Sequence, residues 1–183
     1  MKELARELSV PLPAEESAGW NDFASLVREH QAMVFSIGYH FLHDVSLAEE
    51  LAQEVFLQLH RNLKSLKSPS HVKHWLRRVA GHRSIDFSRH RGSMPSVALD
   101  DVPEPAAAVV DGDPMLAGKL RKLVASLPPK ARMVVILRYQ EDLELEEIAA
   151  ALGMPLGTVK SQLQRALATL REKAARSIGE VYP

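Results

Sequence analysis

The chain has 183 residues, no cysteine and a formal net charge of +0. The lack of cysteine excludes disulfides and thiolate metal sites, and it fits a reducing cytoplasm. No segment approaches about 18 consecutive apolar residues, so no membrane insertion is expected. Hydrophobic residues make up 46% of the chain and aromatic residues only 5%, a composition that favours an all-α fold.

The N-terminal part of the chain predicts a loose arm followed by two helices. Residues 1–19 are polar and contain proline, which is typical of an arm. From Trp20 onward, apolar residues recur at steps of three and four positions, the spacing of one helix face. Ser46 and Glu49 have the spacing of a capping box, so they are expected to open a second helix that ends near Leu63.

The segment that follows is strongly basic. After a loop at 64–69, Ser70 is expected to cap a third helix that ends near Arg91. Gly81 falls in the middle of this helix and costs about 1 kcal/mol relative to Ala, so a close contact or a kink is expected there. Asp86 is expected to form a local ion pair or a cap. The segregated charge indicates phosphate binding despite the zero net charge, and the basic residues are Lys73, Arg77, Arg78, Arg83, Arg89 and Arg91.

A linker and a second set of helices are predicted for the C-terminal half. Residues 93–112 contain prolines and acidic residues but no Lys or Arg, which is a linker composition. Asp113 is expected to cap a helix that opens with proline, and the sequence Leu127-Pro-Pro to end it and start another. Two more helices are predicted at Glu144–Leu152 and from Pro155 to Arg176.

The last two predicted helices have the pattern of a helix-turn-helix. That motif needs a small residue on its first helix, a tight turn and an exposed second helix. Ala149 is the small residue, Gly153 can adopt the left-handed conformation of the turn, and Pro155 suits the start of the second helix. One face of the second helix is apolar and carries Val159, Leu163, Ala166, Leu167 and Leu170. The other face carries Lys160, Ser161, Gln164 and Arg165, side chains that bind phosphates and base edges in a major groove. An amphipathic hairpin with a solvated charged face is the alternative.

Two sets of short sequences carry a resemblance to a known family. The first set is Ala48-Glu-Glu-Leu-Ala-Gln-Glu-Val-Phe56, Trp75-Leu76 and Ile85-Asp86. The second is Leu127-Pro-Pro-Lys-Ala-Arg132, Val134-Val-Ile-Leu-Arg-Tyr139 and Gly157-Thr-Val-Lys-Ser161. In this order they resemble the sigma-2 and sigma-4 domains of extracytoplasmic-function (ECF, group 4) sigma factors of the sigma-70 family. The resemblance implies a sigma-2 bundle of three or four helices at 20–92 and a four-helix sigma-4 domain at 113–178.

The resemblance also implies an alternative sigma factor, which binds core RNA polymerase, recognises a promoter and helps to open it. The second helix would bind the clamp helices of the polymerase beta-prime subunit through an acidic rim and two partly exposed apolar residues: Glu49, Glu50, Gln53, Glu54, Phe56 and Leu57. The third helix and the loop before it would bind the minus-10 element through His71, Lys73, His74, Arg77, Arg78, His82 and Arg83. The sigma-4 domain would meet the beta flap and the minus-35 element, the latter through Lys130, Arg138, Thr158, Lys160, Ser161, Gln164 and Arg165.

Two positions depart from the family pattern. Relatives often have Asn where this chain has His82, and Arg where it has Gln162, so the base preference stays open. A stand-alone helix-turn-helix regulator that binds duplex DNA is the alternative function. An anti-sigma factor is a further partner that the resemblance implies, and the expected location is the cytoplasm.

Neither catalysis nor a cofactor is expected, because the chain has no phosphate-binding loop and no hydrolase or zinc-protease motif. The pairs His40/His43 and His71/His74 have helical spacing, but no third ligand joins them. We therefore expect these histidines on the surface or facing nucleic acid. Trp75 lies on the apolar stripe of the third helix and is expected in the core.

Overall fold

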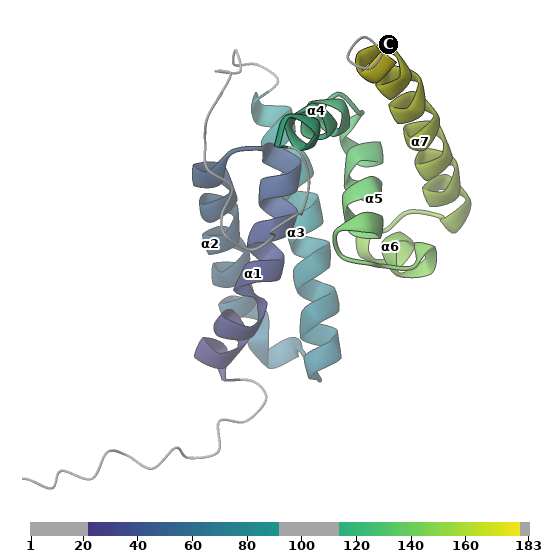
Figure 1. Cartoon of the computed structure of the whole chain (residues 1–183). Helices are drawn as coiled ribbons and strands as arrows, with labels where there is room; N and C mark the ends of the chain where they lie inside the picture. The colour runs from purple at the N-terminus through teal and green to yellow at the C-terminus, as the bar shows by residue number, and fades with distance from the viewer. Residues whose placement is uncertain (1–21, 92–113, 180–183) are drawn as a thin grey trace, which may run out of the picture.

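The computed structural model describes residues 22–91 and 114–179 (Figure 1). Within these ranges the chain forms α-helices and one short 3-10 turn, η1, and no strand. The all-α prediction is therefore confirmed. The elements are α1 (Phe23–Leu42), α2 (Val45–Asn62), η1 (Leu63–Ser65), α3 (Pro69–Arg91), α4 (Pro114–Ala125), α5 (Pro129–Tyr139), α6 (Leu145–Leu152) and α7 (Leu156–Gly179). We call α1–α3 the N-terminal bundle and α4–α7 the C-terminal bundle.

Aspartates cap the first two helices. The Asp22 side chain accepts from the Ser25 amide at 2.8 Å, and the Asp44 side chain accepts from the Leu47 amide at 3.0 Å. The predicted cap at Ser46 was wrong, because the chain leaves its extended conformation at Asp44 and is already helical at Val45. The predicted start of α1 at Trp20 lies outside the described residues.

The start of α3 also differs from the prediction. Pro69 is its first residue, and the Ser68 hydroxyl accepts from the His71 amide at 3.2 Å. Ser70 therefore lies inside the first turn and is not the cap. Proline suits the first helical position, because its missing N–H would have no partner within the helix. The predicted cap at Asp113 lies outside the described residues.

The core of the N-terminal bundle consists of side chains from all three helices. Phe41, Leu51, Leu59 and Leu76 are each fully buried. Burial of a side chain of this size stabilises the fold by about 1.5–3 kcal/mol. Trp75 is partly buried and packs against this core, as predicted.

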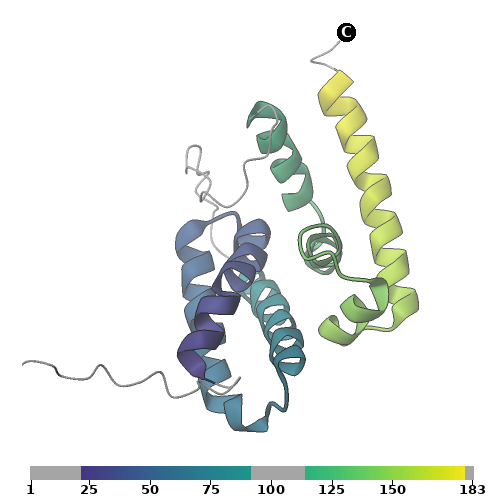
Figure 2. The same ribbon diagram turned by 60° about the horizontal axis from the view of Figure 1, so that its bottom comes forward.

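The C-terminal bundle is centred on α5, with Met133, Val134 and Leu137 fully buried. Ile148 of α6 and Val159 of α7 complete this packing. The long helix α7 begins at Leu156, one residue later than predicted. In both Figure 1 and Figure 2, α7 lies on the outer side of the C-terminal bundle, away from α1–α3.

The two bundles pack directly against each other. α5 contacts α1 and α3, and α6 contacts α3, so α3 lies beside the C-terminal bundle in both views (Figures 1 and 2). Residues of both bundles belong to one hydrophobic cluster. Gly81 of α3 lies at this contact: a Cβ there would be 3.3 Å from Leu152 Cδ2 and 3.6 Å from Met133 Sδ. The predicted close contact at Gly81 is confirmed, whereas nothing in the sequence predicted the bundle contact itself.

Candidate nucleic-acid and polymerase interfaces

The turn between α6 and α7 has the predicted geometry. Gly153 has φ +61°, and its amide donates to the Ala149 carbonyl. The Met154 amide donates to the same carbonyl at 3.0 Å. At the other end of α6, the Glu147 carboxylate accepts from the Glu144 amide at 2.9 Å. Both ends of this short helix are therefore held by local hydrogen bonds.

The predicted DNA-reading residues lie on the solvent face of α7. Val159 and Ala166 are buried beneath it. Lys160, Gln164 and Arg165 are exposed, whereas Thr158, Ser161 and Gln162 are partly buried. Arg165 bends back along its own helix and donates to the Ser161 hydroxyl at 3.1 Å. The helix thus presents a compact polar surface that a nucleic acid can reach.

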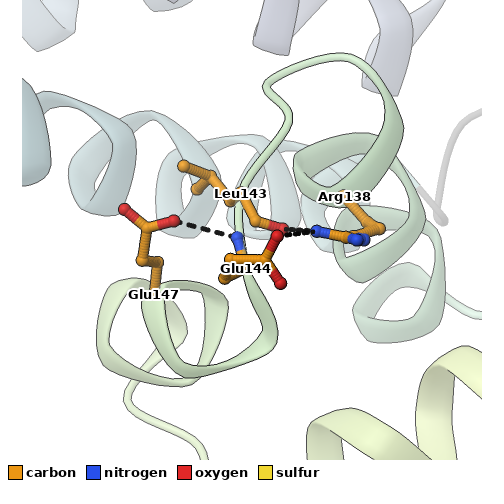
Figure 3. A network of polar contacts seen from close by, with 4 residues as sticks. All are labelled: Arg138, Leu143, Glu144 and Glu147. Carbon is orange, nitrogen blue, oxygen red and sulfur yellow. Dashed lines mark hydrogen bonds and ion pairs between the residues drawn. The ribbon is translucent and has the colours of Figure 1, made fainter.

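Arg138 connects α5 to the start of α6 (Figure 3). One of its terminal nitrogens donates to the Leu143 carbonyl at 2.8 Å and to the Glu144 carboxylate at 3.0 Å. The hydrogen bond to Glu144 raises the pKa of the Arg138 guanidinium. Part of the donor capacity of Arg138 is therefore used within the protein. Lys130, its predicted companion, is exposed at the start of α5.

The predicted minus-10 residues divide into two groups. His71, Lys73, Arg78 and His82 are exposed, and His74, Arg77 and Arg83 are partly buried. Arg83 Nε lies 3.9 Å from Glu54 Oε2 on α2. Arg83, a predicted DNA contact, therefore forms an ion pair with Glu54, a predicted polymerase contact. Asp86 pairs with Arg89 at 3.6 Å, which confirms the predicted local ion pair.

Arg77 faces the C-terminal bundle. Its terminal nitrogen lies 3.5 Å from Glu141 Oε2 and donates to the Glu141 carbonyl at 3.4 Å. The two side chains are only 15% and 8% exposed. Burial raises the pKa of the Glu141 carboxyl, while the Arg77 guanidinium opposes that rise. The sequence singled out Arg77 as a DNA contact but gave no sign of this acidic partner, 64 positions further along the chain.

An apolar groove of about 1210 Å³ runs along α1 and α2. Of the predicted polymerase contacts, Glu49, Gln53, Phe56 and Leu57 line it. Leu57 is 58% exposed, but Phe56 is only 8% exposed, so its predicted partial exposure was wrong. The side chain of Phe56 packs into the hydrophobic core of the protein. The other members of the set, Glu50 and Glu54, are exposed and partly buried, respectively.

A partly buried cation, Arg132, lies at the contact between the two bundles, and no pattern in the sequence predicted it. Arg132 donates to the Phe41 carbonyl at 3.1 Å and to the Leu127 carbonyl at 3.2 Å, and it also donates to Ala125. Nearby, His43 occupies the left-handed position that ends α1, with φ 54°. A surface position was expected for His43, but both of its ring nitrogens are buried. Burial and then Arg132 lower its pKa to about 4.

Within 22–91 and 114–179, no group of three or more His, Asp or Glu is arranged to hold a metal ion. None of the described helices has a segment long and apolar enough to cross a membrane. The described residues present three candidate binding surfaces: an apolar groove with Glu49 among its lining residues, a helix with exposed basic side chains, and a helix-turn-helix.

The fold and these surfaces define the class of the protein, a helical DNA-binding protein with a helix-turn-helix. Residues 26–94 match the family described as Sigma-70 region 2, and residues 117–170 match Sigma-70, region 4. The chain belongs to the extracytoplasmic-function sigma factors of the sigma-70 family. It is an alternative sigma factor that directs the initiation of transcription.

Relatives support this assignment over most of the chain. It is 33% identical over 171 residues to the ECF RNA polymerase sigma factor SigE of Mycolicibacterium smegmatis, which covers 90% of this chain and 66% of that protein. It is 30% identical over 168 residues to the ECF RNA polymerase sigma factor SigW of Bacillus subtilis, with 82% and 88% covered.

Solved structures share the fold. The sigma factor RpoE of Bartonella quintana, in complex with the anti-sigma factor NepR, has a TM-score of 0.67 and 22% identity, covering 83% of this chain and 96% of that one. CnrH, in complex with the cytosolic domain of CnrY, has a TM-score of 0.65 and 19% identity, covering 87% and 92%. At these identities the likeness concerns the fold alone.

Proposed function

We propose that the two halves of the chain have different binding functions. Residues 20–92 bind core polymerase and the minus-10 element, residues 93–112 are the linker, and residues 113–178 bind the minus-35 element and the beta flap. The observation that carries the proposal is the solvent face of α7, where Lys160, Gln164 and Arg165 follow a turn fixed by Gly153. A helix presented in this way fits the major groove of duplex DNA.

The groove along α1 and α2 is the proposed site for the polymerase. Its floor is apolar, with Phe23, Phe35 and Leu57 among its lining residues. Glu49 also lines it and is exposed to solvent. An apolar centre with a charged rim is the usual composition of a protein interface, and this rim suits a helical partner with basic side chains, such as the clamp helices of the beta-prime subunit.

The exposed cations of α3 are the proposed contacts to the opened minus-10 strand. Lys73 and Arg78 are exposed on this helix. Capture of a single strand needs cations for its backbone and a surface for an extruded base. His71 and His74, near the start of α3, supply rings for such a surface.

Three further statements rest on the family. The chain contributes no catalytic residue, since the polymerase performs the chemistry. The chain acts in the cytoplasm, where polymerase and promoter are located. An anti-sigma factor is the proposed negative regulator, a role supported by the named partner of the Bartonella quintana structure.

The test of this proposal is promoter-dependent run-off transcription with purified core polymerase. Wild type should produce a defined transcript, and Glu49→Lys should lose both core binding and that transcript. Glu29→Lys is the matched control, because Glu29 is exposed on α1 and does not line the groove. Tight, specific binding of the chain alone to duplex DNA, with no transcript from core enzyme, would instead support the stand-alone regulator.

A further inference from the structure

Arg83 lies on the side of α3 that faces the interior of the N-terminal bundle. It follows Val79 by one turn and Leu76 by two, the spacing of residues on one face of an α-helix. Leu76 is fully buried, and Val79 packs against the same core. The exposed cation Arg78 precedes Arg83 by five positions, which is about 140° around the helix. Arg83 and Arg78 therefore point to different sides of α3.

The guanidinium of Arg83 is held by α2. Its Nε lies 3.9 Å from Glu54 Oε2, and both side chains are 42% exposed. A side-chain amide is oriented by the hydrogen bonds that it can make, and Gln58, one turn after Glu54, therefore turns its oxygen toward α3. This oxygen accepts from Arg83 Nε at 2.9 Å and also from a terminal nitrogen of the same guanidinium.

Gln58 contributes more to this contact than Glu54 does. An ion pair as long and as exposed as that between Arg83 and Glu54 contributes little to stability. A hydrogen bond from a charged donor is stronger than one between neutral groups, and Gln58 accepts two of them. Neither Glu54 nor Gln58 is among the residues that line the groove along α1 and α2. The contact therefore joins α2 to α3 outside the groove proposed for the polymerase.

We propose that Arg83 is a positioning residue that fixes α3 against α2, and that it does not bind promoter DNA. The inference rests on the function proposed for α3. Lys73 and Arg78 are exposed and keep their charges for the DNA backbone. A binding surface needs side chains outside it that hold its elements in place. Arg83 has this role, because its contact with Gln58 sets where α3 lies beside α2, the helix proposed to bind the polymerase.

Binding of the holoenzyme to a promoter fragment distinguishes positioning from DNA contact. Gln58→Leu removes the acceptor and leaves the Arg83 guanidinium free to meet DNA. If Arg83 positions α3, Gln58→Leu and Arg83→Gln should each lower promoter affinity about 5-fold or more, the scale of one lost hydrogen bond. The double variant should lose no more than either single variant. Gln58→Glu keeps an acceptor for Arg83 and should retain the wild-type affinity.

The salt dependence of the same binding identifies cations that meet phosphates. Each phosphate contact adds about 0.7–0.9 to the slope of log affinity against log salt concentration. Arg78→Gln changes an exposed cation of the same helix and should reduce the slope by about this amount. Arg83→Gln makes the same change of charge and should keep the wild-type slope.

Urea unfolding of the chain alone tests the contact without polymerase or DNA. In a double-mutant cycle, the losses of stability in Arg83→Gln and Gln58→Leu should be coupled, because the two residues share one contact. The losses in Arg78→Gln and Gln58→Leu should simply add, because these residues share none.

The outcomes separate the two proposals. Additive losses for Arg83→Gln and Gln58→Leu would overturn the contact. Wild-type or higher promoter affinity in Gln58→Leu would overturn the positioning role, and so would a salt slope that falls in Arg83→Gln as far as in Arg78→Gln. A wild-type chain that gives no transcript with core enzyme overturns the proposed function together with the role of Arg83 in it, whereas the other failures leave the proposed function in place.

Discussion

The guanidinium of Arg132 lies over the ring of Phe41, with its central carbon 5.0 Å from the ring centroid. This relationship joins α5 to the end of α1 and is reinforced by the hydrogen bond from Arg132 to the Phe41 carbonyl. Because the guanidinium is held by several carbonyls and one aromatic face, it orients the first turn of α5 relative to the N-terminal bundle.

Arg132→Lys should therefore destabilise the protein by about 2 kcal/mol, since lysine keeps the charge but cannot reproduce the planar fork of hydrogen bonds in this partly buried site. The measurement is urea unfolding followed by circular dichroism. Arg78→Lys, at an exposed position, is the control and should stay within about 0.5 kcal/mol of wild type. Equal unfolding midpoints for the two variants would contradict the structural role of Arg132.

The partly buried ring of His43, with both nitrogens buried, predicts a pH dependence of stability. Its pKa falls from 6.5 to about 4 in the folded chain, because burial disfavours the charged ring. Between these two values the unfolded chain binds a proton that the folded chain does not, so stability should decrease as pH falls from 6.5 toward about 4. One such group contributes a slope of at most about 1.4 kcal/mol per pH unit.

His43→Asn separates this effect from the other groups that titrate in the same range. Asn tolerates the left-handed conformation at the end of α1 and does not titrate. The loss of stability between pH 7 and pH 5 should thus be smaller in His43→Asn than in wild type. His82→Asn changes an exposed histidine and should retain the wild-type loss; identical losses in all three proteins would refute the assignment.

Alanine substitutions at two glycines of the helix-turn-helix should have different effects on stability. Gly153 has φ +61°, so Gly153→Ala strains the backbone although nothing lies within 4 Å of the added carbon. It should destabilise the chain by about 1 kcal/mol. Gly157 lies in the first turn of α7 with the same open surroundings, and Gly157→Ala should be neutral or stabilising by up to about 1 kcal/mol. Thermal unfolding of both variants checks the contrast.

Arg165→Ala tests the recognition face of α7. Arg165 is exposed, and its hydrogen bonds within the protein are to the neighbouring turn. Its loss should cost roughly 1–3 kcal/mol of promoter binding if it reads a base, concentrated at one position of the minus-35 element. Binding of the holoenzyme to a set of single-base variants of that element is the measurement. A uniform loss across all variants would assign Arg165 to a phosphate instead of a base.

Local patterns in the sequence determined the helices and the turn. The periodic apolar residues predicted α1, α2 and α3, and Gly153 predicted the end of α6, because each of these features depends on neighbours within one or two turns. The predicted caps at Ser46 and Ser70 were wrong for a related reason. Several polar residues in each segment could act as the cap, and the choice depended on where the chain turned, after His43 in one case and at Ser68 in the other.

The tertiary structure alone decided that the two bundles meet, and it left two side chains less exposed than the sequence predicted. Phe56 and His43 were expected at or near the surface, but helix packing buried Phe56 and both ring nitrogens of His43. Arg77 and Glu141 are 64 positions apart, and no motif in the sequence predicts that they pair. A contact of this kind depends on how two completed bundles fit together. The sequence by itself therefore determined the helices and the class of protein, whereas the pairing that covers part of α3 followed only from their arrangement in space.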